Sequence, residues 1–317
     1  MAAMTVAIHG GCGTLGRGEQ SEADWEDTRR HLGASLRAAW AVLRAGGRSL
    51  DAVEAAVVLM EDSPHFNAGH GAALNENSEH ELDASIMDGA TLAAGAVCAV
   101  RRVRNPIRAA RAVLERGDCV LLCGLAADDF AGRCGLPLVD NAYFTTERRV
   151  RALSVMKALA RRGTIGCATE AERHGTVGAV ALDAQGNLAA ATSTGGYNNK
   201  PVGRVGDSAL PGAGTYARNG VCAVSCTGQG EVFIRCVAAH QLAARMLYAG
   251  QSLADAARAV VFDDVGPHGA GAGMVAIDAQ GAVQLPFNTL GMARGWIGGD
   301  GVVRVATHQE VHPLGAA

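Results

Sequence analysis

The chain has 317 residues, of which 49% are apolar, enough for one large hydrophobic core or two smaller ones, so the composition excludes a disordered protein. A net charge of −3, scattered lysines and arginines, and an aromatic content of 4% provide no basic patch or stacking surface for nucleic acid. Glycine or charged residues interrupt the apolar runs, and residues 1–5 lack a signal-peptide pattern, so we expect a cytoplasmic protein without a membrane span.

The first predicted element is a short strand from Thr5 to Ile8, which runs into a glycine-rich turn. In this turn, Gly11, Gly13 and Gly16 match the G-x-G-x-x-G pattern of dinucleotide-binding loops. That pattern needs a helix directly after the loop, whereas a polar segment broken by glycine follows here. We therefore interpret the turn as a place where the backbone comes close to another segment. A nucleotide-binding oxidoreductase stays as an alternative.

Helical and strand-like patterns then alternate as far as residue 161. Ser49 is expected to cap the second helix, and Asn105 with Pro106 to open the third. The predicted elements are helices over 22–45 and 50–61, strands over 79–87 and 95–103, a helix over 105–115, a buried strand over 119–123 and a helix over 145–161.

The segment from residue 162 to Gly175 has no sustained period and many helix breakers, so we expect an exposed linker. After it, residues 176–182 and 187–194 alternate like the two strands of a hairpin. The remaining predicted elements are a strand over 221–227, a turn at Gly228–Gly230, helices over 231–248 and 252–261, and a second hairpin around 273–281. Hairpins between groups of helices predict an α/β (α+β) fold, a four-layer α/β/β/α sandwich in a single domain over 1–317.

Cysteine and histidine spacing indicates no metal or redox site. The nine cysteines form no C-x-x-C pair, and the closest pairs, Cys119/Cys123 and Cys222/Cys226, lie in apolar runs. We expect them to be reduced residues of the core. The ten histidines form no H-x-x-x-H or H-E-x-x-H pattern, so no catalytic metal is expected.

Thr176 is the candidate nucleophile, because the linker that ends at Gly175 could be cut there without loss of core. A threonine hydroxyl is a weak nucleophile unless a base takes its proton. A free α-amino group, with a pKa of about 7.7–8.0, supplies that base within the same residue. Attack of the Thr176 hydroxyl on the Gly175 carbonyl would expose it. Thr164 has the same local form but is not followed by a strand, so Thr176 is preferred.

Other residues could complete such a site. Thr194 would face Thr176 at the open end of the hairpin, and Thr227 with Gly228 could donate to an oxyanion. Arg204 could bind a carboxylate and Asp207 an ammonium group, which together would hold an amino acid. Taken singly, each of these residues is also typical of an ordinary strand or loop.

In combination, these motifs resemble the plant-type L-asparaginase/isoaspartyl aminopeptidase family of N-terminal-nucleophile hydrolases. The resemblance covers nearly the whole chain and is carried by residues 5–13, 66–71, 81–95, 175–196, 203–207 and 225–235. It implies a precursor that cuts itself into an α subunit (1–175) and a β subunit (176–317), with two such αβ units associating into a dimer.

The resemblance also implies roles for individual residues. Thr176 would be the nucleophile, Thr194 its neighbour, and Thr227 with Gly228 the oxyanion hole. Arg204 would bind the substrate α-carboxylate, Asp207 and Gly230 its α-amino group, and Asn67 would face the active site. A structural sodium ion would be held by backbone carbonyls of Met60, Glu61, Ser63, Phe66, Ala68 and His70, with no cofactor for catalysis. Gln229 stands where a smaller residue is commonest, which bears on substrate preference.

The expected reaction is hydrolysis of β-aspartyl dipeptides and of L-asparagine to L-aspartate. A glycosylasparaginase-like amidase is an alternative within the same chemistry. The absence of a secretion pattern argues against it.

Overall fold

A computed structural model describes residues 4–13, 21–162 and 175–317. Gly16 of the glycine-rich turn and the rival Thr164 lie outside these residues. The helices are α1 (Glu22–Arg44), α2 (Ser49–Glu61), α3 (Pro106–Arg116), α4 (Gly124–Arg133), α5 (Glu147–Arg161), α7 (Gly230–Cys236), α8 (Ala238–Ala249) and α9 (Leu253–Ala259). The strands are β1 (Thr5–Cys12), β2 (Leu82–Asp88), β3 (Ala94–Val100), β4 (Leu121–Cys123), β5 (Val177–Leu182), β6 (Leu188–Thr194), β7 (Thr215–Arg218), β8 (Cys222–Gly228), β9 (Ala272–Asp278), β10 (Val283–Gln284), β11 (Met292–Ile297), β12 (Val302–Ala306) and β13 (His312–Ala316).

Within the described residues, the strands form two sheets. The larger has nine strands in the order β13-β12-β11-β1-β5-β6-β2-β3-β4, and the smaller has four in the order β10-β9-β8-β7. Neighbouring strands are antiparallel except for the parallel pair β3 and β4. The β5–β6 hairpin at the centre of the larger sheet pairs Val177 with Ser193, which places Thr176 and Thr194 together at its open end.

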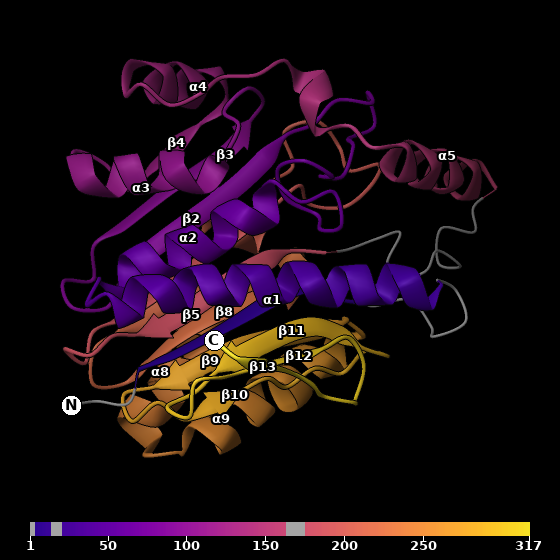
Figure 1. The fold of residues 1–317 in the computed structure, drawn as a ribbon. Coiled ribbons are helices and arrows are strands. Elements are labelled where there is room, and N and C mark those ends of the chain that lie inside the picture. Colours follow the sequence, from indigo (N-terminus) through magenta and orange to yellow (C-terminus); the bar gives the residue numbers. More distant parts are fainter. Residues whose placement is uncertain (1–3, 14–20, 163–174) are drawn as a thin grey trace.

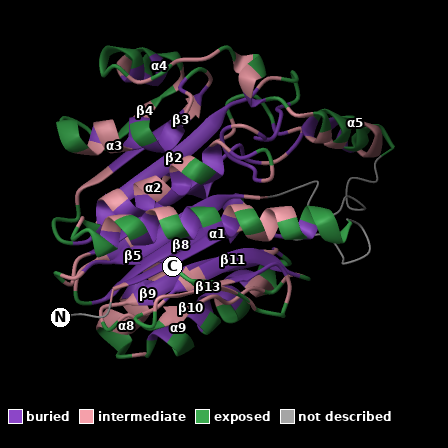
Figure 2. Ribbon diagram, viewed as in Figure 1, coloured by how far each residue is buried: buried purple, intermediate pink, exposed green. Residues whose placement is uncertain are grey.

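The two sheets and their helices make four layers (Figure 1). Helices α1, α2 and α3 cover one face of the larger sheet, with a core that includes Leu36, Val53 and Ile107. The smaller sheet packs on the opposite face, and α8 and α9 cover its outer side. The strands are mostly buried, while the outer helices α4 and α5 are largely exposed (Figure 2). The predicted α/β/β/α sandwich is therefore confirmed.

The layer between the sheets combines small side chains such as Ala7, Ala190 and Ala223 with larger ones such as Leu182 and Ile277, all fully buried. Where the small residues lie, the two sheets can approach closely, which brings strands from both sheets into contact with one site. Among the described residues, no helix is both long and apolar enough to span a membrane.

Two predicted elements were wrong in detail at the surface. The strand around Cys119–Cys123 is short and exposed, because β4 is the last strand of its sheet, and Cys119 and Cys123 are exposed rather than in the core. Cys222 and Cys226 are buried as expected. The helix predicted over 231–248 is divided into α7 and α8 at Val237, whose φ of 49° is left-handed.

Of the two predicted helix caps, the one at Asn105 is confirmed and the one at Ser49 is wrong. Ser49 is the first residue of α2 rather than its N-cap, which is Arg48. The Ser49 N–H donates instead to the buried Asp183 carboxylate at 3.0 Å, so a residue of the β5–β6 turn caps the helix. Asn105 is the N-cap of α3, but its side chain makes no capping hydrogen bond.

Candidate active site

Thr176 and Thr194 lie side by side, as the hairpin pattern predicted. Thr176 directly precedes β5, Thr194 is the last residue of β6, and their Oγ1 atoms are 3.3 Å apart. Both residues are buried, with exposures of 6% and 3%. The Thr194 hydroxyl also accepts the N–H of Gly196 at 3.0 Å, which fixes its orientation. The nucleophile candidate therefore has an ordered hydroxyl neighbour.

The Gly175 carbonyl is surrounded by donors. Its oxygen is 2.8 Å from Thr176 Oγ1 and 3.0 Å from Thr194 Oγ1. Asn67 Nδ2 donates to the same oxygen at 2.7 Å. Two backbone contacts hold the Asn67 side chain: Ala73 N–H donates to its Oδ1, and its Nδ2 reaches the Gly196 carbonyl. A negative charge that develops on the Gly175 oxygen would thus meet two side-chain donors besides Thr176.

Glycine is required where β1 passes this peptide bond. Gly11 has φ of 110°, and a Cβ there would lie 3.1 Å from Gly175 Cα and 3.2 Å from Thr176 N. Gly175 itself has φ of 153°, a region that favours glycine. The close backbone approach expected of the glycine-rich turn therefore exists, and its target is the Gly175–Thr176 bond.

His9 is a part of the site that the sequence did not indicate. The residue is fully buried, with Nδ1 3.0 Å from the Thr176 carbonyl and Nε2 2.9 Å from Ser225 Oγ. Burial lowers the pKa of His9 to about 3, although the Thr176 carbonyl opposes this shift, so the ring is neutral. Because a carbonyl only accepts, Nδ1 carries the proton and Nε2 accepts from Ser225.

Behind Ser225, a chain of buried hydroxyl groups crosses the layer between the sheets. Ser225 Oγ is 2.7 Å from Thr192 Oγ1, which accepts from Thr215 Oγ1 at 2.5 Å. Thr215 is joined to Ser85, whose hydroxyl also reaches the Ser208 carbonyl at 2.6 Å. Ser208 adjoins Asp207, so the chain of contacts links Thr176, through His9, to the loop that carries Asp207. Its members come from strands far apart in sequence, and no local pattern marks them.

Arg204 and Asp207 line the same pocket as Thr176, as the sequence predicted, together with Gly175, Thr194, Gly196, Gly228 and Gly230. The Arg204 guanidinium lies over the Tyr197 ring and pairs with Glu231 at 2.9 Å. The Asp207 carboxylate is buried, and its Oδ2 atom has no hydrogen-bond partner. Burial raises the pKa of Asp207 to about 7, although Arg204 opposes this shift. An unpaired buried carboxylate is suited to accept an ammonium group.

The predicted oxyanion donors are the last two residues of β8. Gly228 lies on the pocket, ahead of the N-terminus of α7 at Gly230. Thr227 is fully buried, and its Oγ1 accepts the N–H of Cys12 at 3.2 Å, which leaves its own proton available for donation. Cys12 thus connects the glycine-rich turn to this side of the site.

The predicted sodium loop follows α2. The carbonyls of Met60 and Glu61 accept backbone N–H groups from Ser63 and His70. Arg148 donates to the His65 carbonyl at 2.8 Å, so a guanidinium already binds part of the loop. A carbonyl oxygen has two lone pairs and can accept a second partner, so the sodium site with its six carbonyl ligands stays a prediction.

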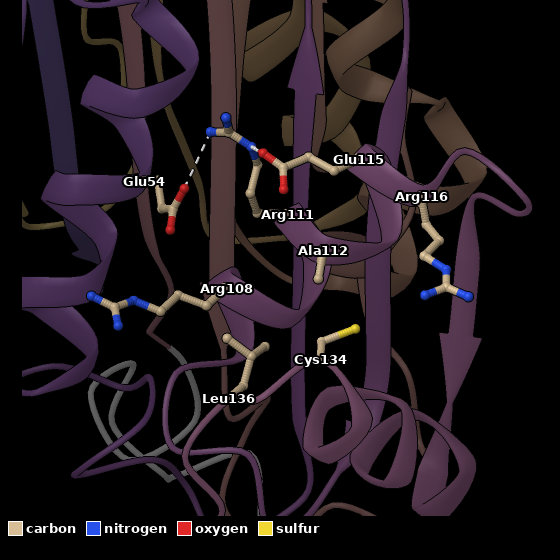
Figure 3. Close-up of a pocket in the computed structure, with 8 residues that line it drawn as sticks. All are labelled: Glu54, Arg108, Arg111, Ala112, Glu115, Arg116, Cys134 and Leu136. Atoms are coloured by element: carbon tan, nitrogen blue, oxygen red, sulfur yellow. Dashed lines mark hydrogen bonds and ion pairs between the residues drawn. The ribbon is translucent and has the colours of Figure 1, made fainter.

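A larger pocket of about 610 Å³ lies away from Thr176, between α2 and α3 (Figure 3). Three of its charged side chains pair with one another: Arg111 contacts both Glu54 and Glu115. Ion pairs of this kind are common on protein surfaces, so we interpret the pocket as a surface groove without a catalytic role.

Comparison with known proteins agrees with this geometry. The family model described as asparaginase matches residues 2–307. The chain is 47% identical over 301 residues to an isoaspartyl peptidase of Escherichia coli (strain K12), covering 93% of each chain. It is 38% identical over 330 residues to a probable isoaspartyl peptidase/L-asparaginase 2 of Arabidopsis thaliana, covering 96% of this chain and 99% of that one. It is 46% identical over 230 residues to an isoaspartyl peptidase/L-asparaginase of Homo sapiens, covering 73% and 72%.

With a family model that matches almost its full length, and a threonine pair and glycine turn at the expected places, the chain belongs to the asparaginase family of N-terminal-nucleophile hydrolases.

Proposed function

We propose that this protein hydrolyses β-aspartyl (isoaspartyl) dipeptides and L-asparagine to L-aspartate, with Thr176 as an N-terminal nucleophile. The observation that carries the proposal is the geometry at Gly175, where the Thr176 hydroxyl and two further donors surround one carbonyl oxygen. The names of the relatives point to the same substrates. Members of the family need no cofactor for catalysis, and each step below uses groups of the chain.

Maturation begins when Thr176 Oγ1 attacks the Gly175 carbonyl carbon. Thr194 and Asn67 stabilise the charge on the Gly175 oxygen through their contacts of 3.0 and 2.7 Å. The C–N bond breaks, the Thr176 nitrogen takes a proton, and an ester remains between Gly175 and the hydroxyl. Water hydrolyses this ester, which leaves an α subunit (1–175) with a Gly175 carboxylate and a β subunit (176–317) with a free α-amino group.

Turnover then uses the new amino group as base. It takes the Thr176 hydroxyl proton while Oγ1 attacks the side-chain carbonyl of the substrate. The Gly228 N–H and the Thr227 hydroxyl stabilise the oxyanion, and ammonia or the amine of the next residue departs with a proton. Water hydrolyses the β-aspartyl ester on Thr176 and releases aspartate.

Substrate orientation follows from the charges of Arg204 and Asp207, which together form an amino-acid clamp. Arg204 binds the α-carboxylate in exchange for part of its contact with Glu231. Asp207, which lines the same pocket, binds the α-amino group with its carboxylate. A Cβ at Gly230 would lie 2.8 Å from Asp207 Oδ1, so only glycine leaves room there for an ammonium group.

The wider assembly is part of the same proposal. The 317 residues form one domain, which remains together after cleavage because β1 and β5 pair across the cut. Two αβ units associate into a dimer in the cytoplasm. A sodium ion on the loop after α2 would hold the backbone around Asn67.

The substitution Thr176→Ala tests the proposal. Denaturing mass spectrometry should show two fragments from the parent protein, divided between Gly175 and Thr176, and one uncut chain from the variant. The parent should release aspartate from a β-aspartyl dipeptide, and the variant should not. Thr164→Ala, which changes the rival threonine, should be cut and active like the parent. An active, full-length Thr176→Ala protein would refute the proposal.

A further inference from the structure

Two histidines and one aspartate gather outside the active site, where α1 meets the loop after α2. Asp27 and His31 lie one helical turn apart on α1, and His65 reaches them from the loop. One ligand atom from each residue lies within 4.8 Å of the other two. Asp27 Oδ2 is 3.4 Å from His65 Nε2, and the centroids of the two imidazole rings are 4.7 Å apart. The catalytic steps above use none of these residues.

These distances fit a metal ion. Zinc binds imidazole nitrogen and carboxylate oxygen at about 2.0–2.2 Å in a tetrahedron, which places neighbouring ligand atoms about 3.4 Å apart. The Asp27–His65 distance already has this value, and a His31 ring nitrogen lies within 4.8 Å of both ligand atoms. Two imidazoles and one carboxylate favour zinc-type ions over calcium or magnesium, which prefer oxygen ligands alone. We propose that Asp27, His31 and His65 form a binding site for a zinc-type divalent ion, with water as the fourth ligand.

The surroundings hold the ligands in place. Arg30 pairs with the other oxygen of Asp27, Oδ1, at 2.6 Å, which orients the carboxylate and leaves Oδ2 for the ion. Arg148 donates to the His65 carbonyl at 2.8 Å and fixes the loop at that residue. Asp24 lies close enough to act on the charge of His65, so the two arginines are balanced by two carboxylates.

A bound ion would join two elements that are separate in sequence. His65 lies two residues before Asn67, which donates to the Gly175 carbonyl. The ion would therefore tether α1 to the loop that carries Asn67, as a structural site beside the catalytic one. The inference rests on the cluster alone and holds whether or not the proposed function is correct.

Metal binding is measured on the full chain without a histidine tag, after the exposed thiols of Cys119, Cys123 and Cys134 have been alkylated. Titration with Zn²⁺ should show one equivalent bound per chain, and Zn²⁺ should raise the thermal midpoint. Co²⁺ should give visible bands of nitrogen and oxygen coordination without a thiolate band. Asp27→Asn, His31→Gln and His65→Gln should each weaken binding by at least about tenfold.

The control variant is His268→Asn, which changes an exposed histidine bonded to Arg235 and should bind Zn²⁺ like the parent. Thermal midpoints without metal separate lost binding from lost folding, because the three ligand variants keep side chains of similar size. Absence of one-equivalent binding by the parent, or equal affinity in the parent and all three ligand variants, would overturn the site.

Discussion

At the scale of single residues, the proposed role of the buried Asp207 carboxylate predicts that substrate binding depends on pH. Its raised pKa of about 7 means that the free protein carries a neutral Asp207 below that pH. A neutral carboxyl cannot pair with an ammonium group, so we expect KM for a β-aspartyl dipeptide to rise about tenfold per pH unit as the pH falls below 7. Steady-state kinetics between pH 5 and 8 measure this.

A substrate analogue controls for other titrating groups. Succinamate has the amide and one carboxylate but no α-amino group, so its KM should not show the same rise at low pH. Asp207→Asn should raise KM for the dipeptide and remove most of its dependence on pH. Parallel pH profiles of KM for the dipeptide and succinamate would contradict the role of Asp207.

The hydroxyl chain behind His9 is the second feature at this scale. Ser225 donates to Nε2 of His9, while Nδ1–H of the same ring holds the Thr176 carbonyl. In Ser225→Ala, Nε2 would lose its donor, so only the Thr176 carbonyl would position the buried ring. We expect slower self-cleavage and a lower kcat by roughly tenfold, the effect of about 1.4 kcal/mol, with little change in KM because the clamp is untouched.

Ser193→Ala is the matched control for this change. Ser193 is an equally buried hydroxyl on β6, but it faces the helical layer and donates to Glu61 Oε1 at 2.7 Å. Its loss should cost similar stability, about 1–3 kcal/mol, while kcat stays at the parent value. Equal losses of kcat in both variants would mean that Ser225 acts through general stability alone.

At the scale of elements, the junction between α7 and α8 contains stored strain. Val237 has φ of 49°, a left-handed conformation that costs a residue with a Cβ roughly 1–2 kcal/mol. The side chain is 48% exposed, so little packing is lost without it. Relief of this strain, less the entropic cost of glycine, should make Val237→Gly raise the free energy of unfolding by roughly 0.5–1 kcal/mol, measured by denaturant titration. Val237→Ala keeps its Cβ and should gain clearly less; an equal gain would show that backbone strain is not the cause.

The sequence predicted correctly those elements that are determined by residues close together in the chain. Alternation around the turn at 183–186 predicts β5 and β6, and therefore the meeting of Thr176 with Thr194. Helices α7 and α8 were predicted as a single helix over 231–248, because the spacing of apolar residues does not reveal a single left-handed residue such as Val237. The bonds of His9 to Ser225 join positions 216 residues apart on strands of different sheets, so only the folded chain reveals them.

At the scale of the whole molecule, polar groups are concentrated where the two sheets meet beside the active site. Apolar side chains such as Ala7, Val180 and Ala223 fill much of that layer, while Ser225, Thr192 and Thr215 form a continuous chain of hydrogen bonds across it. Buried polar groups are costly unless each has a partner. The partners here fix the relative position of the sheets, and therefore of the proposed nucleophile on the larger sheet and the proposed oxyanion donors on the smaller.

The same burial gives the molecule opposing responses to acid. Burial lowers the pKa of His9 to about 3 and that of His80 to about 4, so the unfolded chain takes up protons below pH 6.5 that the folded one does not. Each histidine therefore lowers the free energy of unfolding as the pH falls, by up to about 1.4 kcal/mol per pH unit. Burial raises the pKa of Asp207 and of Glu61, so over part of this range the folded chain binds protons that the unfolded chain does not. These two carboxyl groups therefore raise the free energy of unfolding as the pH falls.

In the parent protein, the buried histidines and carboxyl groups have opposing effects on how the free energy of unfolding depends on pH. A substitution of one histidine reveals the effect of that residue alone. His80 bonds the Ala73 carbonyl and the Thr145 hydroxyl, and glutamine in its place can make similar bonds without titrating. We expect His80→Gln to gain stability relative to the parent by about 1.4 kcal/mol per pH unit as the pH falls from 6 to 4.5. Urea titrations at several pH values measure the difference. The exposed variant His268→Asn should track the parent, and a constant difference between His80→Gln and the parent would show that His80 is not held neutral by burial.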